Sequence, residues 1–170
     1  MGRGVIFLPK FIVGVMGGGE NVSAETVQTA YRLGKMIAQK GWVLLCGGRP
    51  AGVMEASARG AKDAGGLTVG ILPDMDKGGA SRYIDIAIAT GMGDGRNYIN
   101  ALSSDIVVAL PGRAGTVSEI ALALKNGRKV ILLAFDPGVV FDCYRDEGLL
   151  ITADTPEEAI RLIEEFCPAR

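Results

Sequence analysis

Apolar residues in this chain come in short runs that are separated by longer stretches of helical periodicity. The central example is the almost wholly apolar run Asp105-Ile-Val-Val-Ala-Leu110, which the turn Pro111-Gly-Arg-Ala-Gly-Thr116 connects to an apolar stretch ending at Lys125. A short run of β-branched and aliphatic residues predicts a strand buried on both faces, and apolar residues three and four apart predict a helix. The segment is therefore expected to form a strand, a turn and a helix.

The same alternation runs along the whole chain. Strands are predicted at 11–16, 42–46, 67–72, 83–89, 105–110, 129–134 and 149–151, with the last of these at an edge. Helices are predicted at about 23–39, 52–64, 92–102 and 116–125, and a last helix starts at the capping sequence Thr155-Pro-Glu-Glu158. The segments 74–82 and 137–147 are expected to be irregular. Asn21 or Ser23 is the expected N-cap of the first helix.

Strands that alternate with helices predict an α/β fold. Because crossovers between parallel strands are right-handed and carry helices, we expect a Rossmann-like, doubly wound, mostly parallel sheet of about six or seven strands with helices on both faces. The sequence shows no repeat, linker or break in composition, so residues 1–170 are expected to form one ligand-binding domain.

Glycines gather at four places next to the predicted strands. They occur at Gly17-Gly18-Gly19, at Gly47-Gly48, between Gly91 and Gly95, and at Gly112 and Gly115. Ligands of such folds bind beyond the carboxyl ends of the strands, where the strand order reverses. Any one glycine pair is explained by an ordinary tight turn. Together, the glycines predict a ligand-binding rim at this edge of the sheet.

The start of the helix after the central strand has two interpretations. Free backbone N–H groups and the helix dipole at Thr116 can hold a phosphate or another anion. The sequence Thr116-Val-Ser-Glu119 also fits a capping box, in which Glu119 would accept from the Thr116 N–H. The spacing alone leaves both interpretations open.

A second polar cluster precedes the central strand. It contains Asp94, Arg96 and Asn97, within Gly91-Met-Gly-Asp-Gly-Arg-Asn97. A guanidinium fork there can bind phosphate or carboxylate, and the two other side chains can bind a sugar or a base. The alternative is that Asp94 caps the helix and Arg96 is a solvated surface residue.

Composition narrows the possible chemistry. The 170 residues are 48% hydrophobic, carry a net charge of −1 and include no histidine. The charge gives no reason to expect nucleic acid as a partner, and no apolar stretch has the length of a membrane span. Without histidine, Ser-His and Cys-His nucleophiles and histidine metal ligands are excluded. The cysteines at 46, 143 and 167 lie far apart, which predicts neither a zinc site nor a disulfide framework.

Targeting and cofactor motifs add two expectations. The absence of a disulfide framework fits a reduced cytoplasmic setting, and Pro9 and Lys10 interrupt the first apolar run before a signal peptide would be complete. No glycine-rich loop has the G-x-G-x-x-G or G-x-x-x-x-G-K-[ST] pattern, and Cys46 stands where a dinucleotide site would need an acidic residue. Sites for NAD and for P-loop nucleotides are therefore not predicted.

The stretch Pro111-Gly-Arg-Ala-Gly-Thr-Val-Ser-Glu119 resembles the P-G-G-x-G-T-x-x-E signature of the "lonely guy" superfamily. This superfamily includes cytokinin-activating phosphoribohydrolases and molybdenum cofactor carrier proteins, and its members were long mislabelled lysine decarboxylases. The wider match, which includes Gly91-Met-Gly-Asp-Gly-Arg-Asn-Tyr-Ile-Asn100, is most similar to the short bacterial branch that groups with the cofactor carriers.

The resemblance implies roles for particular residues. In the hydrolases, the signature glycines and threonine hold a 5′-phosphate, and the glutamate and an upstream arginine act at the ribose and the scissile bond. The corresponding residues here are Gly112, Gly115, Thr116, Glu119 and Arg96, the last two being catalytic only in a hydrolase. The predicted ligand site also includes the rim residues Gly17, Gly18, Gly47, Gly48, Asp94, Asn97 and Arg113. No metal site is predicted.

Two departures from the hydrolase pattern matter: Arg113 adds bulk and charge that would tune or block the anion site, and Asn97, together with the resemblance to the carrier branch, favours binding over catalysis. Arg113 replaces the second glycine of the signature, and Asn97 follows Arg96 where the hydrolases carry lysine. The first hypothesis is therefore a carrier for a small phosphorylated nucleotide-like or pterin ligand, such as the molybdenum cofactor, with no other cofactor required. The second is a nucleoside 5′-monophosphate phosphoribohydrolase. Lysine decarboxylation is rejected, because no lysine stands in a pyridoxal phosphate motif. The resemblance also implies a homo-oligomer, either a dimer or a tetramer.

Overall fold

A computed structural model describes residues 9–167 of the chain, which form a seven-stranded parallel sheet flanked by helices. The strands are β1 Ile12–Met16, β2 Val43–Cys46, β3 Thr68–Leu72, β4 Ile86–Ala89, β5 Ile106–Ala109, β6 Lys129–Leu133 and β7 Leu150–Ala153. The α-helices are α1 Ala24–Gln39, α2 Gly52–Asp63, α3 Arg96–Ser103, α4 Ala114–Lys125, α5 Asp142–Asp146 and α6 Pro156–Phe166. Two 3₁₀ turns, η1 Gly93–Gly95 and η2 Val139–Phe141, precede α3 and α5. Residues 1–8, on which the expectation about a signal peptide partly rests, lie outside the described residues.

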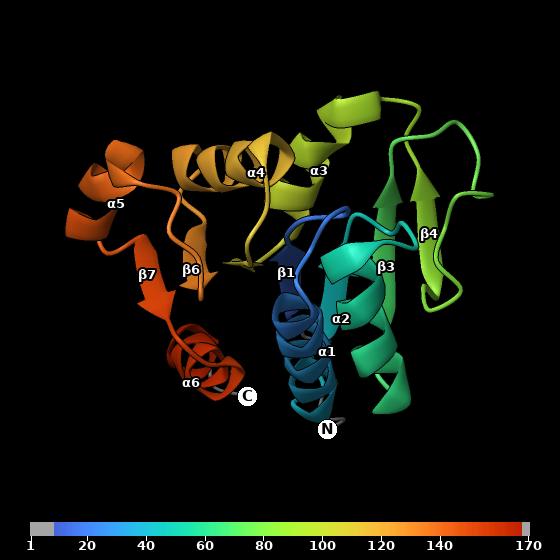
Figure 1. Ribbon diagram of the computed structural model, residues 1–170, viewed down its shortest axis with the longest axis horizontal. Coiled ribbons are helices and arrows are strands. Elements are labelled where there is room, and N and C mark those ends of the chain that lie inside the picture. Colours follow the sequence, from blue (N-terminus) through green and yellow to red (C-terminus); the bar gives the residue numbers. More distant parts are fainter. Residues whose placement is uncertain (1–8, 168–170) are drawn as a thin grey trace, which may run out of the picture.

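Helices cover both faces of the sheet, which confirms the predicted doubly wound α/β fold. Figure 1 shows α1, α2 and α6 on one side and α3, α4 and α5 on the other. Each side has its own apolar core: Val13 and Val15 of β1 belong to the core under α1 and α2, whereas Val107 of β5 belongs to the core under α3 and α4. Strands β1, β2 and β5 are central and almost wholly buried, as expected for near-continuous apolar runs.

The strand order reverses between β1 and β5. The sheet order is β4-β3-β2-β1-β5-β6-β7, so the chain builds one half outward from β1 and then returns to build the other half from β5. Strand β1 pairs with both neighbours, with Val13 opposite Leu44 on one side and Ile106 on the other. The carboxyl ends of β1 and β5 therefore flank the crevice in which such folds bind ligands.

Helices α1 and α2 pack very close to each other. A Cβ atom at Gly34 of α1 would lie 2.0 Å from the Ser57 carbonyl oxygen, and one at Gly60 of α2 would lie 2.0 Å from the Tyr31 carbonyl oxygen. Only glycine fits at either crossing point. This contact fixes the two helices that follow the glycine-rich ends of β1 and β2.

The structure corrects the predicted strand at 83–89. Strand β4 begins only at Ile86. The Asp85 carboxylate accepts hydrogen bonds from the Thr68 N–H at 2.9 Å and from Lys62 Nζ at 2.6 Å. The last strand, β7, begins and ends later than predicted, and it is an edge strand as predicted.

Two further predictions change, and one pair of alternatives is resolved. The predicted helix at 92–102 is divided into η1 and α3, and the segment 137–147 contains η2 and α5 instead of being wholly irregular. Ser23, rather than Asn21, caps α1, because its Oγ accepts from the Thr26 N–H at 3.1 Å. No helix within residues 9–167 has the length and apolar character needed to cross a membrane.

Candidate functional site

A cavity of about 500 Å³ opens at the carboxyl edge of the sheet, where the strand order reverses. Its walls come from the ends of β1 and β2, the start of α2, the segment from η1 to α3 and the first turns of α4. The lining residues are Val15, Met16, Gly17, Gly18, Gly19, Glu20, Gly47, Met54, Asp94, Arg96, Asn97, Arg113, Gly115, Thr116 and Glu119. This volume lies within the range of small-molecule sites in proteins.

Most of the predicted site residues meet in this cavity. They are Gly17, Gly18, Gly47, Asp94, Arg96, Asn97, Arg113, Gly115, Thr116 and Glu119. Gly48 and Gly112 were also predicted but do not line the cavity. A Cβ at Gly48 would lie 2.9 Å from Gly70 Cα, and one at Gly112 would lie 2.1 Å from Thr116 Oγ1, so both glycines allow close packing.

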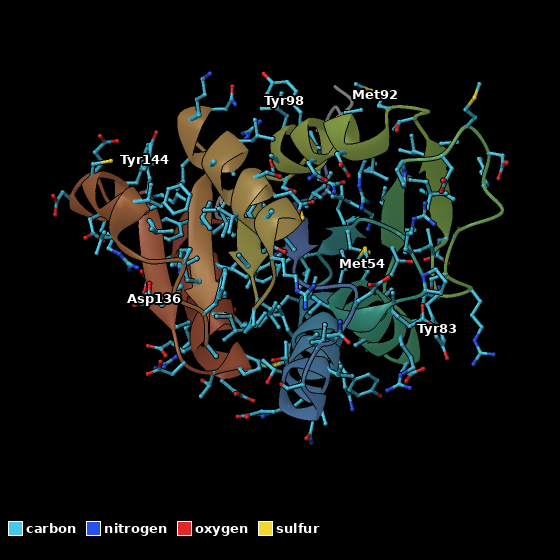
Figure 2. All side chains as sticks on the ribbon, turned by 45° about the horizontal axis from the view of Figure 1, so that its top comes forward. Met54, Tyr83, Met92, Tyr98, Asp136 and Tyr144 are labelled. Carbon is cyan, nitrogen blue, oxygen red and sulfur yellow. The ribbon has the colours of Figure 1, made fainter. Side chains whose placement is uncertain are left out.

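Sequence reasoning missed four lining residues, namely Val15, Met16, Glu20 and Met54, whereas Gly19 belongs to the predicted glycine rim. Glu20 directly follows the three glycines, and this position could have identified it. Met54 carries no such signal, because a methionine in an apolar helical pattern predicts core packing. Figure 2 shows Met54 on the inner side of α3, whereas Met92 and Tyr98 lie on the outer side of that segment.

Arg96 is held in place by the ends of two strands. Its Nη1 donates to the carbonyl of Gly47, just after β2, and to the Ile71 carbonyl of β3, both at 2.6 Å. A Cβ at Gly47 would lie 2.2 Å from this nitrogen, so the arginine position requires glycine there. The alternative of a solvated Arg96 is therefore wrong, and the guanidinium is part of the cavity wall.

Helix α4 does not begin as a capping box. It starts at Ala114, with Arg113 as an N-cap whose side chain makes no capping hydrogen bond. Glu119 lies in the second turn of the helix and binds Asn100, so the capping-box interpretation is wrong. The first N–H groups of a helix have no intrahelical partner, and Gly115 and Thr116 of this turn line the cavity. This end of α4 has the features of an anion site, which the helix dipole favours.

Arg113 lies at the mouth of the cavity. It is exposed, and no ion pair within residues 9–167 engages its side chain. Its backbone has a φ of −108°, which does not require glycine. The arginine therefore adds a cationic group beside the start of α4.

Glu119 is a buried carboxylate in the cavity wall. It is only 7% exposed, and its Oε1 accepts from Asn100 Nδ2 at 2.7 Å. Burial raises the pKa of Glu119 to about 7, although the Asn100 hydrogen bond and the charge of Arg96 act to lower it. Near neutral pH this group therefore exists in both protonation states.

Asn97 also joins two helices. It is buried, and its Nδ2 donates to Ser118 Oγ at 2.9 Å, a bond between α3 and α4 beside the cavity. The predicted capping by Asp94 is not observed, since neither η1 nor α3 has a side-chain cap. Among residues 9–167, no group of three His, Cys, Asp or Glu side chains is placed to hold a metal ion.

Comparison with known proteins gives this site its relatives. The chain matches the SLOG cluster4 family over residues 10–160. The molybdenum cofactor binding protein of Rippkaea orientalis is 47% identical, with a TM-score of 0.87 over 94% of this chain and 98% of that one. The molybdenum cofactor carrier protein of Chlamydomonas reinhardtii is 43% identical, with a TM-score of 0.86 over 93% of this chain and 98% of that one.

A more distant relative is an enzyme. The cytokinin riboside 5′-monophosphate phosphoribohydrolase of Mycobacterium tuberculosis is 36% identical over 106 residues, which are 61% of this chain and 57% of that protein. Together, these matches confirm the superfamily that the signature from Pro111 to Glu119 indicated.

Proposed function

The chain belongs to the SLOG cluster4 family, and we propose that it is a carrier for a phosphorylated pterin or nucleotide-like ligand, similar to molybdenum cofactor carriers. One observation carries the proposal. A cavity of about 500 Å³ combines the start of α4, which has no side-chain cap, with a fixed guanidinium and several apolar side chains.

These three features suit three parts of such a ligand. The first N–H groups of α4, near Gly115 and Thr116, would hold the phosphate. Arg96 and Arg113 would add positive charge beside it. Val15, Met16 and Met54 offer apolar surface against which a planar ring can pack.

The relatives favour a carrier over a hydrolase. Both carrier structures match this chain over nearly their whole length, whereas the hydrolase match covers little more than half of either protein. Asn97 stands where the resemblance expects the lysine of the hydrolases, and its amide is used to join α3 to α4. Binding without turnover is therefore the preferred function.

The ligand itself provides the most direct test. Protein purified from cells would be denatured, and the released small molecules identified by mass spectrometry. We expect a phosphorylated pterin or nucleotide in the wild type and its loss in Gly115→Asp, which places a carboxylate at the anion site. Gln28→Glu makes the same change of charge on the exposed surface of α1 and should retain the ligand. Equal ligand content in both variants would contradict the proposed site.

A second experiment tests for hydrolysis. Pure protein would be incubated with AMP and with N6-substituted adenosine monophosphates. A carrier should release no ribose 5-phosphate. Release that disappears in Glu119→Ala would replace the carrier function with that of a phosphoribohydrolase.

We further propose that the protein forms a homo-oligomer, a dimer or a tetramer, in the cytoplasm. Exposed apolar side chains support an oligomer, since Ile86 and Ile88 of β4 and Tyr98 of α3 are each more than 40% exposed. Analytical ultracentrifugation would test the assembly. A monomer at micromolar concentration would contradict it.

A further inference from the structure

The charges that line the cavity do not by themselves suit an anion. Three residues with carboxylates, Glu20, Asp94 and Glu119, line the cavity together with Arg96 and Arg113. With all five groups ionised, the lining side chains carry one excess negative charge. A phosphorylated ligand, as proposed above, would bring about two more negative charges into the same space.

Glu119 differs from the other two carboxylates in its surroundings. Glu20 and Asp94 are exposed, whereas Glu119 is 7% exposed and lies in the wall formed by α4. Only its Oε1 has a hydrogen-bond donor within the described residues, which is Asn100 Nδ2 at 2.7 Å. Water cannot stabilise a charge here as well as it does at the rim, so this carboxylate is the one whose charge is removed most easily.

Asn100 is itself fully buried, at 0% exposure, and lies outside the predicted site. Its Oδ1 is enclosed and has no hydrogen-bond partner within residues 9–167. The amide therefore has a donor engaged by Glu119 and an acceptor that is still free.

Few other charged groups act on Glu119. From α3, Arg96 contributes a positive charge that favours the ionised carboxylate. From β2, Cys46 faces the same region, but burial raises the pKa of its thiol to about 11, so it stays neutral at physiological pH. The neighbouring strand β5 beneath α4 is wholly apolar. Glu20, Asp94 and Arg113 complete the charges that line the cavity.

We propose that Asn100 and Glu119 form a proton-accepting pair, so that the cavity binds a phosphorylated ligand together with one proton. The proton comes from solvent and forms an O–H bond at Glu119 Oε2, while Asn100 holds Oε1. This step removes the excess negative charge of the lining. The neutral carboxyl group can then donate a hydrogen bond to an anionic oxygen of the ligand, which a carboxylate would repel.

Asn100 acts in this pair as a positioning residue. It contacts Glu119 rather than the space in which the ligand would lie. Its hydrogen bond favours the ionised state, so its removal should shift the titration of Glu119 to higher pH. The proposal rests on the proposed anion site, and it adds a dependence on pH that the site alone does not require.

Isothermal titration calorimetry can count the proton. AMP would be titrated into the wild-type protein at pH 8.0 in PIPES, HEPES and Tris, whose different heats of protonation report the protons taken up. At this pH the phosphate of AMP is already a dianion, so the ligand contributes little to the count. We expect an uptake of roughly 0.5 to 1 proton per AMP bound, which falls as the pH is lowered below the pKa of about 7.

Two matched variants assign the proton. Glu119→Gln keeps the acceptor for Asn100 but cannot titrate, so it should bind AMP without proton uptake. Glu20→Gln removes one charge from the rim of the same cavity, and it should bind AMP more tightly with the wild-type number of protons. Equal proton uptake in the wild type and Glu119→Gln, or binding to the wild type without uptake, would overturn the proposal.

A spectroscopic measurement tests the role of Asn100 without a ligand. The ¹³C signal of the Glu119 carboxyl group would be followed from pH 4 to pH 10 in the wild type and in Asn100→Leu. We expect a higher midpoint in the variant, and an unchanged midpoint would overturn the positioning role. If AMP fails to bind the wild type even at millimolar concentration, the proposed anion site fails first, and the proton coupling fails with it.

Discussion

Replacing Glu119 with glutamine should make the folded protein more stable at neutral and alkaline pH. The carboxylate is buried in a wall that has only Asn100 to compensate its charge directly. Glutamine has almost the same shape and can still accept from Asn100. It removes only the cost of holding a charge away from water.

The size of the effect follows from the pKa. Burial raises the pKa of Glu119 from 4.5 to about 7, and this difference corresponds to roughly 3 kcal/mol between the two protonation states. The folded state binds the proton more tightly than the unfolded state, so the free energy of unfolding of the wild type falls as the pH rises from about 4.5 to about 7. Glutamine does not titrate and avoids this loss.

The assay is urea unfolding of both proteins at pH 4, 5.5, 7 and 8.5. The two curves should nearly coincide at pH 4, and the advantage of Glu119→Gln should grow to about 3 kcal/mol and then level off above pH 7. As a control, Glu20→Gln removes an exposed carboxylate and should change stability by less than about 0.5 kcal/mol at each pH.

A pH-independent difference between the wild type and Glu119→Gln would refute this reasoning. It would mean that the carboxyl group titrates alike in the folded and unfolded states, so that burial does not shift its pKa. A variant that is less stable than the wild type at pH 8.5 would mean that the charge stabilises the fold.

Three further changes test other parts of the structure. Gly34→Ala should lower the free energy of unfolding by about 1–3 kcal/mol, because the new Cβ would lie 2.0 Å from the Ser57 carbonyl oxygen. Urea unfolding measures this change. A variant as stable as the wild type would contradict the close contact between α1 and α2. Arg96→Lys should cost about 1–3 kcal/mol by the same assay and weaken AMP binding, because the shorter lysine side chain does not bring its nitrogen to the position from which Arg96 Nη1 donates to both carbonyls. Unchanged binding would exclude the guanidinium from the site. Thr155→Ala should lower the free energy of unfolding by about 0.5–2 kcal/mol, because the Thr155 Oγ1 caps α6. Thermal unfolding measures this change, and an unchanged Tm would mean that the cap does not stabilise the fold.

Much of the fold could be predicted because its signals are local. The runs that became β1, β2 and β5 are apolar at every position that a doubly covered strand buries. The start of α6 carries its threonine, proline and glutamate in the expected order. Where a bond joins distant residues, prediction failed. The strand predicted at 83–89 begins only at Ile86, and Asp85 instead binds Thr68 and Lys62. These partners lie 17 and 23 residues away, and no local pattern marks them.

The site shows the same division. The glycines, Arg96 and the α4 signature could be found in the sequence, because they lie in short motifs at the ends of strands. The pairing of Asn100 with Glu119 spans 19 residues and depends on the packing of α3 against α4. Met54 enters the cavity because of how α2 sits on the sheet. Such features require the assembled fold, and the spacing of the signature left the partner of Glu119 open.

The two arginines of the cavity differ in how much side-chain entropy they would lose when a ligand binds. Arg96 is immobilised by the carbonyls of Gly47 and Ile71, so its loss of rotamer entropy, up to about 2 kcal/mol, belongs to the folding of the chain. Arg113 is exposed and unrestrained by an ion pair within residues 9–167, so its ordering would accompany binding. The interior of the cavity is thus preorganised around one fixed cation, while its mouth can adapt to ligands of different length.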